Sequence, residues 1–559
     1  MIGEQPAVAH MKWWGWGEPG VSFSHSDKPK LAPFVRAKVG IDLDRPGAAA
    51  PDLEALDLPL SHVGKELLDA LTSAVGAEHV RDGRLERVVH AYGKSLRDLL
   101  RLRAGDVGRL PDVVVYPGSE DEVAAVVAAT EAAGAVVVPF GGGTNISGSL
   151  EPPRAETRTV VSVDLGRLDQ VVSIDEDAQL AVIQAGARGP SLEAQLEAQG
   201  WTMGHFPDSF THSTLGGWIA TRSSGMQSDK YGDISGITKA VRVVTPAGLL
   251  ATRAVPATST GPSVREMVLG SEGRLGIITE ATVQVHRIPD ERVILGYFFP
   301  TWGDGLAAMA ELATMDSHPS LTRISDANET QFSLATSKKG SLVSSLESAA
   351  LKLYLRRVKE YDLDQACLAF IGFEGGAEHV KAQRRAAGKV VTGHGGVCLG
   401  SGPGRLYDQK KFDTPYIRDY LLDRGVAGDV SETAMPWSRL MPVYDAVIAA
   451  GHEAFARAGV RGYLMCHLSH SYHAGACLYF TFAFVPPDGG DMIACYELVK
   501  CAIQQAFVDN GATLSHHHAV GTEHARWLEQ DISAPGVRML QALFDGTDPG
   551  RHLNPGKIV

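Results

Sequence analysis

The chain of 559 residues lacks the usual features of secreted, membrane-spanning and nucleic-acid-binding proteins. Its formal net charge is -13, whereas non-specific binding to nucleic acid needs a basic surface. No apolar stretch reaches the roughly 20 residues that cross a bilayer, and the amino terminus has no apolar core typical of a secretory signal. The last residues, "PGKIV", contain no peroxisomal tripeptide. We therefore expect a cytoplasmic protein.

Cysteine is also scarce, with six residues that all lie in the second half of the chain. None of them forms a C-x-x-C pair, so neither a zinc ribbon nor a redox dithiol is indicated. Such a low content in a long chain is typical of reduced thiols in the cytosol.

What the chain does contain is enough apolar sequence for a large core, with 44% hydrophobic and 21% charged residues. At the usual ~100–200 residues per domain, the length predicts about three units. Short β-branched runs and helical stretches mix without strict alternation, which predicts an α+β fold. The predicted units are an amino-terminal extended arm and helical segment, a mixed α+β domain, a second domain with an antiparallel sheet covered by helices, and a carboxyl-terminal segment. Their ranges are 1–106, 107–289, 290–512 and 513–559.

The most informative local motif is "VVVPFGGGTNISGS", in which a strand runs into Gly141, Gly142 and Gly143. Glycines allow backbone N–H groups to approach an anion closely, although a plain turn is an equally simple interpretation of three glycines. Neither the dinucleotide-binding pattern nor the Walker pattern fits, because Ile146 replaces the last glycine of the former and Ser149 the lysine of the latter. The motif therefore suits a pyrophosphate outside those two folds.

Two further polar glycine loops follow, at 206–234 and 270–281, and a closing "DPGRHLNPGKIV" ends the chain. Together these motifs resemble the vanillyl-alcohol oxidase family, whose PCMH-type FAD-binding domain has two α+β lobes joined to a cap domain. Within that family the motifs "KWWGWG", "SETAMPW", "SYHAGACLYFTFAF" and "LSHHHAVG" are similar to those of the enzymes that form the ether bond of ether lipids. The resemblance covers nearly the whole chain.

The resemblance implies that four segments bind FAD. No residue directly before the glycines is suited to a covalent flavin link, so non-covalent binding is expected. The implied cofactor-binding residues are Pro139, Phe140, Gly141, Gly142, Gly143, Thr144, Asn145, Asp208, Ser209, Phe210, Thr211, His212, Ser213, Thr214, Thr221, Arg222, Ser223, Ser224, Glu272, Gly273, Arg274, Leu275, Gly276, Ile277 and Ile278.

The resemblance also implies roles for one tyrosine and two arginines. Tyr472 matches a proton donor and acceptor, and a phenol with a pKa near ~10 needs a neighbour that favours the phenolate to act as a base. Arg418 matches a substrate-binding arginine, and Arg323 an arginine needed for activity. Taken alone, each has a simpler interpretation: packing for Tyr472, a surface pair with Asp419 or Asp423 for Arg418, and a strand-end surface charge for Arg323.

Three adjacent histidines, His516, His517 and His518, raise the alternatives of a metal site, an expression tag or a catalytic pocket. Neighbouring residues in a helix or strand point in different directions, so the run does not place three ligands around one metal, and no metal is expected. Its internal position argues against a tag. Imidazole can donate or accept a proton near neutral pH, so we expect a loop of the active site with at most two rings facing the ligand.

The reaction that the resemblance implies has no net redox change: the acyl chain of 1-acyl-dihydroxyacetone phosphate is exchanged for a long-chain alcohol. The expected partners are these lipid substrates, a second copy in a homodimer, and a membrane surface contacted through a local apolar or basic patch. The alternative is an FAD-dependent oxidoreductase of a 2-hydroxy acid, of the D-lactate or glycolate type, because the same fold performs that chemistry. A flavin-binding protein without catalysis fits Tyr472, Arg418 and the histidines poorly.

Overall fold

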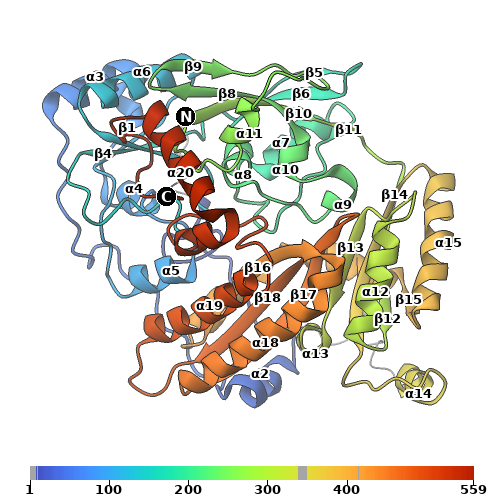
Figure 1. Ribbon diagram of the computed structural model, residues 1–559. Coiled ribbons are helices and arrows are strands. Elements are labelled where there is room, and N and C mark those ends of the chain that lie inside the picture. Colours follow the sequence, from blue (N-terminus) through green and yellow to red (C-terminus); the bar gives the residue numbers. More distant parts are fainter. Residues whose placement is uncertain (1–7, 9, 338–348, 413) are drawn as a thin grey trace.

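The computed structural model describes residues 8, 10–337, 349–412 and 414–559 (Figure 1). The predicted α+β fold is confirmed: residues 80–287 form two small sheets and a two-stranded ribbon, and the second half of the chain forms a larger sheet covered by helices. In the part of the chain that the structure describes, no helix combines the length and apolar character needed to cross a membrane.

The first lobe contains a four-stranded sheet in the order β1-β2-β4-β3. The parallel strands β2, β4 and β3 are buried along their whole length apart from Pro139, as expected of β-branched runs covered on both faces. Helix α6 begins after Ser119, whose side chain accepts a hydrogen bond from the backbone N–H of Glu122. The bounds are β1 Val80–Arg81, β2 Val113–Val115, α6 Glu120–Ala132, β3 Val136–Phe140 and β4 Val160–Asp164.

The second lobe is a five-stranded antiparallel sheet in the order β5-β6-β10-β8-β9, beside a two-stranded ribbon of β7 and β11. Short helices connect its strands. The bounds are β5 Val171–Asp175, β6 Leu180–Gln184, α7 Gly189–Glu197, β7 Trp201–Thr202, α8 Leu215–Thr221, α9 Ser228–Tyr231, α10 Ile234–Ile237, β8 Thr238–Thr245, β9 Gly248–Ala251, α11 Val264–Val268, β10 Ile277–Gln284 and β11 His286–Arg287.

The cap is a seven-stranded antiparallel sheet in the order β15-β12-β14-β13-β17-β18-β16. Its strands are β12 Glu291–Phe299, β13 Leu321–Ser325, β14 Cys367–Gly375, β15 Val397–Gly400, β16 Ala427–Pro436, β17 Arg461–Ser471 and β18 Gly475–Val485. Its helices are α12 Trp302–Ala313, α13 Ala327–Ala335, α14 Ala349–Arg357, α15 Ala377–Gly393, α16 Ser401–Lys410, α17 Thr414–Leu422, α18 Leu440–Arg457 and α19 Met492–Asp509.

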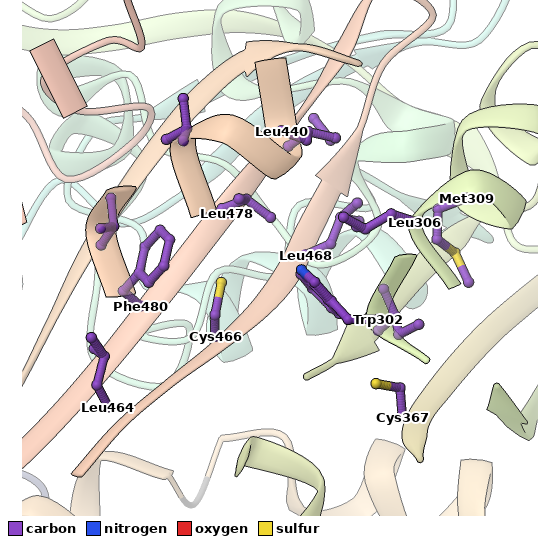
Figure 2. Packing of buried hydrophobic residues seen from close by; sticks show 14 of the residues in the cluster. Trp302, Leu306, Met309, Cys367, Leu440, Leu464, Cys466, Leu468, Leu478 and Phe480 are labelled. Carbon is purple, nitrogen blue, oxygen red and sulfur yellow. The ribbon is translucent and has the colours of Figure 1, made fainter. Parts of the chain in front are cut away.

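Side chains along the central cap strands point alternately to two faces of the sheet. We call the face that packs against the helices the core face and the opposite one the site face. On β17 and β18, Leu464, Cys466, Leu468, Leu478 and Phe480 pack against the helices (Figure 2). Because successive side chains of a strand point to opposite faces, the residues between them point away from the helices. The large cavity described below lies on that second face.

Two expectations from the sequence are wrong. The amino-terminal arm is not extended throughout, because α2, Leu31–Val39, packs on the cap. The carboxyl-terminal segment, for which the sequence indicated no helix, contains α20, Leu528–Thr547. Both were obscured by proline and glycine in and around the helices, including Pro535 inside α20, near which Ser533 departs from helical geometry. The remaining helices of the amino-terminal segment are α3 Lys65–Val75, α4 Arg84–Val89 and α5 Leu96–Arg103.

Candidate active site

A cavity of about 600 Å³ runs between the first two lobes and the site face of the cap sheet. One end is lined by the glycine loop, Pro139 to Asn145, and by parts of the next two polar loops. The other end is apolar and is lined by residues of α2, α13 and β14, including Phe34, Phe332 and Phe370. The cavity therefore joins a polar, glycine-rich end to an apolar end.

The glycine loop packs too tightly to accept side chains. A Cβ atom on Gly142 would lie 2.1 Å from the carbonyl oxygen of His212, and one on Gly141 would lie 2.4 Å from Oγ1 of Thr214. Separations of this size are sterically forbidden, so glycine is required for the two loops to touch. Such a bare backbone cradle fits the pyrophosphate of a dinucleotide.

Most of the residues expected to bind FAD line this cavity. Arg222 does not, because it is exposed and pairs with Glu266, with 3.0 Å between Nη2 and Oε2. The guanidinium of Arg274 instead donates to the carbonyl of Lys557 in the tail, at 2.8 Å. The others outside the lining are Phe210, Thr211, His212, Leu275 and Ile277, which support the loops from behind.

Glu272, in the third polar glycine loop, connects the second lobe to the histidine loop. Its Oε1 accepts hydrogen bonds from the backbone N–H groups of Val520 and Gly521, at 2.9 and 3.0 Å. The side chain of Asn554 donates to the carbonyls of Ser149 and Glu272. Residues far apart in the sequence thus fix the polar end of the cavity.

Arg418 lies on the cavity wall, and some of its N–H donors have no hydrogen-bond partner. Its Nη1 donates to the carbonyl of Lys94 at 2.7 Å, and its Nε lies 4.0 Å from Oδ1 of Asp419. Nε and Nη2 are buried, and neither has a hydrogen-bond partner among the described residues. The pair with Asp419 is therefore present but lies on the cavity wall and not at the surface, and the free guanidinium edge can receive an anion.

Arg323 also lies on the wall, but it is already paired. Its Nη2 donates to Oε1 of Glu329 at 2.8 Å, and Oε2 of the same carboxylate lies 2.8 Å from Nδ1 of His467. Burial opposes ionisation of Glu329, yet His467 and Arg323 lower its pKa to about 2. Arg323 therefore belongs to a buried charge network rather than to the surface.

Tyr472 is in the tight turn between β17 and β18, and its phenol contacts two ionisable groups. The hydroxyl lies 2.8 Å from Oδ2 of Asp233 and 2.5 Å from Nε2 of His516. A carboxylate can only accept, so the phenol donates to Asp233 and accepts from the imidazole. The three groups form a continuous proton path.

The surroundings of Tyr472 differ from what the sequence led us to expect. Burial, and then the charge of Asp233, raise the pKa of the phenol above its ordinary value. The sequence led us to expect a neighbour that favours the phenolate, whereas the observed neighbour, Asp233, disfavours it. Tyr472 remains protonated and can pass a proton to Asp233 only if it receives another. Neither Tyr472 nor His516 is in the cavity lining; Ser224, which is in it, hydrogen-bonds to Asp233.

Glu432, on β16, organises the histidine loop. Its Oε1 accepts from the Ser515 hydroxyl and from the backbone N–H groups of His517 and His518, and its Oε2 accepts from the N–H of His516. Burial alone would raise the pKa of Glu432, but the imidazoles and these donors hold it well below the ordinary value. Burial lowers the pKa values of His516 and His518, so these rings are neutral near neutral pH.

The three histidines do not converge on one point. His517 and His518 line the cavity, while His516 contacts Tyr472 and lies 2.9 Å, Nδ1 to Nδ1, from His517. Together with Glu432 and Cys477, His516 and His517 have ligand atoms within 4.8 Å of one another. The oxygens of Glu432 already accept hydrogen bonds from backbone donors, and burial raises the pKa of the Cys477 thiol. Hydrogen bonds therefore hold these four residues together.

Reasoning from the sequence missed Asp233, Glu329, Glu432 and His467 as site residues. Asp233 and Glu432 lie inside motifs that carry the resemblance, "YGDI" and "SETAMPW", but nothing local indicates which partners they reach. Glu329 and His467 are 138 residues apart and meet only through the pairing of β13 with β17.

Comparison with known proteins places the chain in a family. Residues 111–252 match the family described as FAD binding domain, and residues 288–558 match FAD linked oxidases, C-terminal domain. Alkyldihydroxyacetonephosphate synthase of Dictyostelium discoideum is 36% identical, with 98% of this chain and 93% of that protein covered. The synthase of Trypanosoma brucei brucei is 35% identical, covering 99% and 93%.

Solved structures agree with the sequence comparison. A structure of alkyldihydroxyacetonephosphate synthase superposes with a TM-score of 0.84 at 34% identity, covering 98% of this chain and 99% of the other. A 4-ethylphenol oxidase from Gulosibacter chungangensis shares the fold at a TM-score of 0.67 and 16% identity, covering 90% and 98%. The resemblance inferred from the motifs is confirmed, and FAD is the cofactor that this fold binds. The chain belongs to the alkyldihydroxyacetonephosphate synthase family of FAD-dependent enzymes.

Proposed function

We propose that this protein exchanges the acyl group of 1-acyl-dihydroxyacetone phosphate for a long-chain alcohol and so forms an ether bond. In the overall reaction, the C1–O bond to the fatty acid breaks and a C1–O bond to the alcohol forms. The alcohol loses its proton, the fatty acid leaves as the carboxylate, and no net electrons are transferred. The relatives that cover the whole chain support this assignment.

The observation that carries the proposal is the two-ended cavity. A substrate with a phosphate and a long alkyl chain needs an anion-binding cation and an apolar channel, and the cavity has Arg418 and the apolar end near Phe34 and Phe332. A small 2-hydroxy acid would leave the apolar end unused, so the oxidoreductase alternative fits the cavity less well. We assign Arg418 to the substrate anion.

Bound FAD, which we propose is held non-covalently, supplies the isoalloxazine ring at which the exchange at C1 takes place. The glycine loop holds the cofactor through backbone donors. Tyr472, Asp233 and His516 move a proton that reaches them from C1 through His517, which lines the cavity and contacts His516, with Asp233 as the acceptor at the end of the path. His517 and His518 provide imidazole donors at the cavity wall. A homodimer is also part of the proposal, and light scattering of the purified protein tests it.

An anaerobic assay tests the proposed reaction. The yellow holoenzyme is mixed with palmitoyl-dihydroxyacetone phosphate and hexadecanol and, separately, with D- and L-2-hydroxy acids. We expect release of palmitate and formation of the ether without bleaching of the flavin. Bleaching by a hydroxy acid without ether formation would establish the oxidoreductase instead.

The variant Tyr472→Phe tests the proton path, with exchange of the C1 proton of the substrate with solvent as the measured quantity. The variant should retain FAD but lose roughly 100-fold or more in the exchange of the C1 proton with solvent, since a positioned acid or base typically contributes ~10²–10⁴-fold. Tyr361→Phe makes the same chemical change outside the cavity, where the hydroxyl only donates to the carbonyls of Gly395 and Phe298, and should leave exchange unaltered. Normal exchange in Tyr472→Phe would remove this residue from the mechanism.

A further inference from the structure

A further imidazole, that of His470, lies on the cavity wall beside the histidine loop. Its ring is buried, and its centroid lies 5.2 Å from that of His516 and 5.2 Å from that of His517. Nδ1 lies 2.8 Å from the hydroxyl oxygen of Ser228 and 3.3 Å from that of Ser224. Nε2 makes no hydrogen bond to a described residue.

An irregularity in β17 turns His470 toward the cavity. Before it, Cys466 and Leu468 belong to the core face, whereas Met465 and His467 line the cavity. Simple alternation would place His470 with the core residues. The pairing of β17 with β18 shifts register between Leu468 and His470, however, and a β-bulge of this kind re-aims the side chains beyond it.

The hydrogen bonds of Ser224 determine which nitrogen of His470 carries the proton. Ser224 donates its single hydroxyl proton to Oδ1 of Asp233, because a carboxylate only accepts. Toward Nδ1 the hydroxyl oxygen can then only accept, so Nδ1 carries the hydrogen and Nε2 has a free lone pair. Burial, and then the imidazoles of His516 and His517, lower the pKa of His470 well below its ordinary value, so the ring is neutral.

Asp233 is therefore connected to the cavity on two sides. One connection runs through Tyr472 and the histidine loop, and the other runs through Ser224 to His470. The overall reaction also has two proton tasks, because C1 gives up and regains a proton and the alcohol loses one. The first connection serves C1, which leaves the second for the alcohol.

The cavity-facing residues of β17 lead from the apolar end of the cavity to His470. Tyr463, near the start of the strand, has its ring centroid 5.4 Å from that of Phe34, which lines the apolar end. Met465 and His467 continue this row. An alkyl chain that lies along β17 would end with its hydroxyl beside His470.

We propose that His470 is a catalytic base that accepts the proton of the long-chain alcohol. This inference rests on the proposed function. As the alcohol oxygen bonds to C1, its O–H bond breaks and the proton passes to Nε2. The proton on Nδ1 passes to Oγ of Ser224, and the hydroxyl proton of Ser224 passes to Asp233.

The protons balance over the whole reaction. Asp233 returns the proton that it held from C1 through Tyr472, and it keeps the alcohol's proton until water enters the emptied cavity. That proton is the one released when the fatty acid leaves as the carboxylate. The alcohol oxygen becomes positively charged as it bonds to C1, so a weakly basic imidazole is sufficient to accept its proton.

Acyl exchange provides a reaction that needs no such base. Reversal of fatty-acid release joins a free carboxylate to C1, so labelled palmitate can replace the acyl group of palmitoyl-dihydroxyacetone phosphate. This exchange uses the same cavity and the same chemistry at C1, but palmitate has already lost its proton. A base for the alcohol is therefore needed for ether formation and not for acyl exchange.

Two variants of the holoenzyme remove Nε2. His470→Asn keeps an amide near the position of Nδ1, and His470→Gln keeps the length of the side chain. We expect both to lose roughly 100-fold in kcat for ether formation with hexadecanol, while acyl exchange and flavin absorbance stay near the wild-type values. A hexadecanol with fluorine beside the hydroxyl is more acidic and depends less on a base, so the deficit should shrink. The exposed His452→Gln, on α18, should match the wild type in both reactions.

The comparison of the two reactions separates a catalytic role from a structural one. Equal losses of ether formation and acyl exchange in both variants would overturn the proposal, as would normal ether formation in both. A deficit that stays the same with the fluorinated alcohol would also overturn it. Failure of the proposed function is distinguishable, because the wild type itself would then form no ether.

Discussion

Glu432 determines the geometry of the histidine loop at the scale of a single residue. Both of its oxygens accept backbone N–H groups of the loop, so their positions set where the three rings lie. Its negative charge also favours the protonated forms of His516 and His518, against the effect of burial. Glu432 does not line the cavity itself and acts as a positioning residue.

We expect Glu432→Gln to lower kcat about 10- to 100-fold while FAD remains bound, because one amide N–H₂ would face a backbone donor and leave it unsatisfied, at ~1–3 kcal/mol. Removal of the charge lowers the pKa values of His516 and His518, so the acidic limb of the pH–rate profile should move to lower pH. Steady-state kinetics across pH measure both effects. The exposed Glu453→Gln is the matched control, and an unshifted profile with normal kcat in Glu432→Gln would exclude the positioning role.

At the scale of single elements, the glycine loop depends on close packing between segments that are far apart in the sequence. Strand β3 delivers Gly141 and Gly142 against residues 212–214, and the two backbones meet with no room for a Cβ atom. The tail reinforces the other side of β3, because Val137 exchanges backbone hydrogen bonds with His552 and Asn554. The FAD-binding end of the cavity is therefore assembled from three distant segments.

Gly142→Ala should separate FAD binding from general stability. The added Cβ would lie 2.1 Å from the carbonyl of His212, so the loops must part and the cradle must open. We expect FAD affinity to fall roughly tenfold or more, since a shift of ~1.4 kcal/mol already has that effect. Fluorescence titration of the apoprotein with FAD measures it. Gly388→Ala, inside α15 with nothing within 4 Å of the new Cβ, should bind FAD normally and unfold no more easily. Unchanged affinity in Gly142→Ala would show that the loop does not hold the cofactor.

At the scale of the whole molecule, α5 lies where the amino-terminal segment meets the cap. Leu96 and Leu99 belong to the cap core, while Asp98 points toward Glu151 and Glu523. Both carboxyl oxygens of Asp98 are buried and without a hydrogen-bond partner in the described part of the chain. Burial, and then the charges of Glu523 and Glu151, raise its pKa to about 7.

This raised pKa makes stability depend on pH. Because the folded pKa exceeds the unfolded value, the carboxyl contributes no charge penalty at acidic pH, and the fold loses stability as pH rises toward and through about 7. Asp98→Asn removes the titration. We expect the variant to equal the wild type near about pH 4 and to be more stable by ~1–3 kcal/mol near about pH 8. Chemical unfolding at the two pH values checks this, with the exposed Asp445→Asn as control. An equal difference at both pH values would refute the assignment.

The sequence by itself determined the features that depend on local chemistry. Short β-branched runs predict strands such as β3, and consecutive glycines predict the tight loop after it. Motifs spread along the whole chain were enough to identify the family and its cofactor. Helices α2 and α20 escaped because proline and glycine weaken the local signal, whereas packing stabilises these segments as helices.

Only the tertiary structure decided how the chemical groups act on one another. Tyr472 and Asp233 are 239 residues apart, and no local pattern indicates that a carboxylate would raise the phenol's pKa. Glu432 reaches the histidines across 84 residues, because the loop after α19 returns to β16. Charge interactions and desolvation depend on distance in space, so the protonation states of the site follow from the folded arrangement and not from the residue types alone.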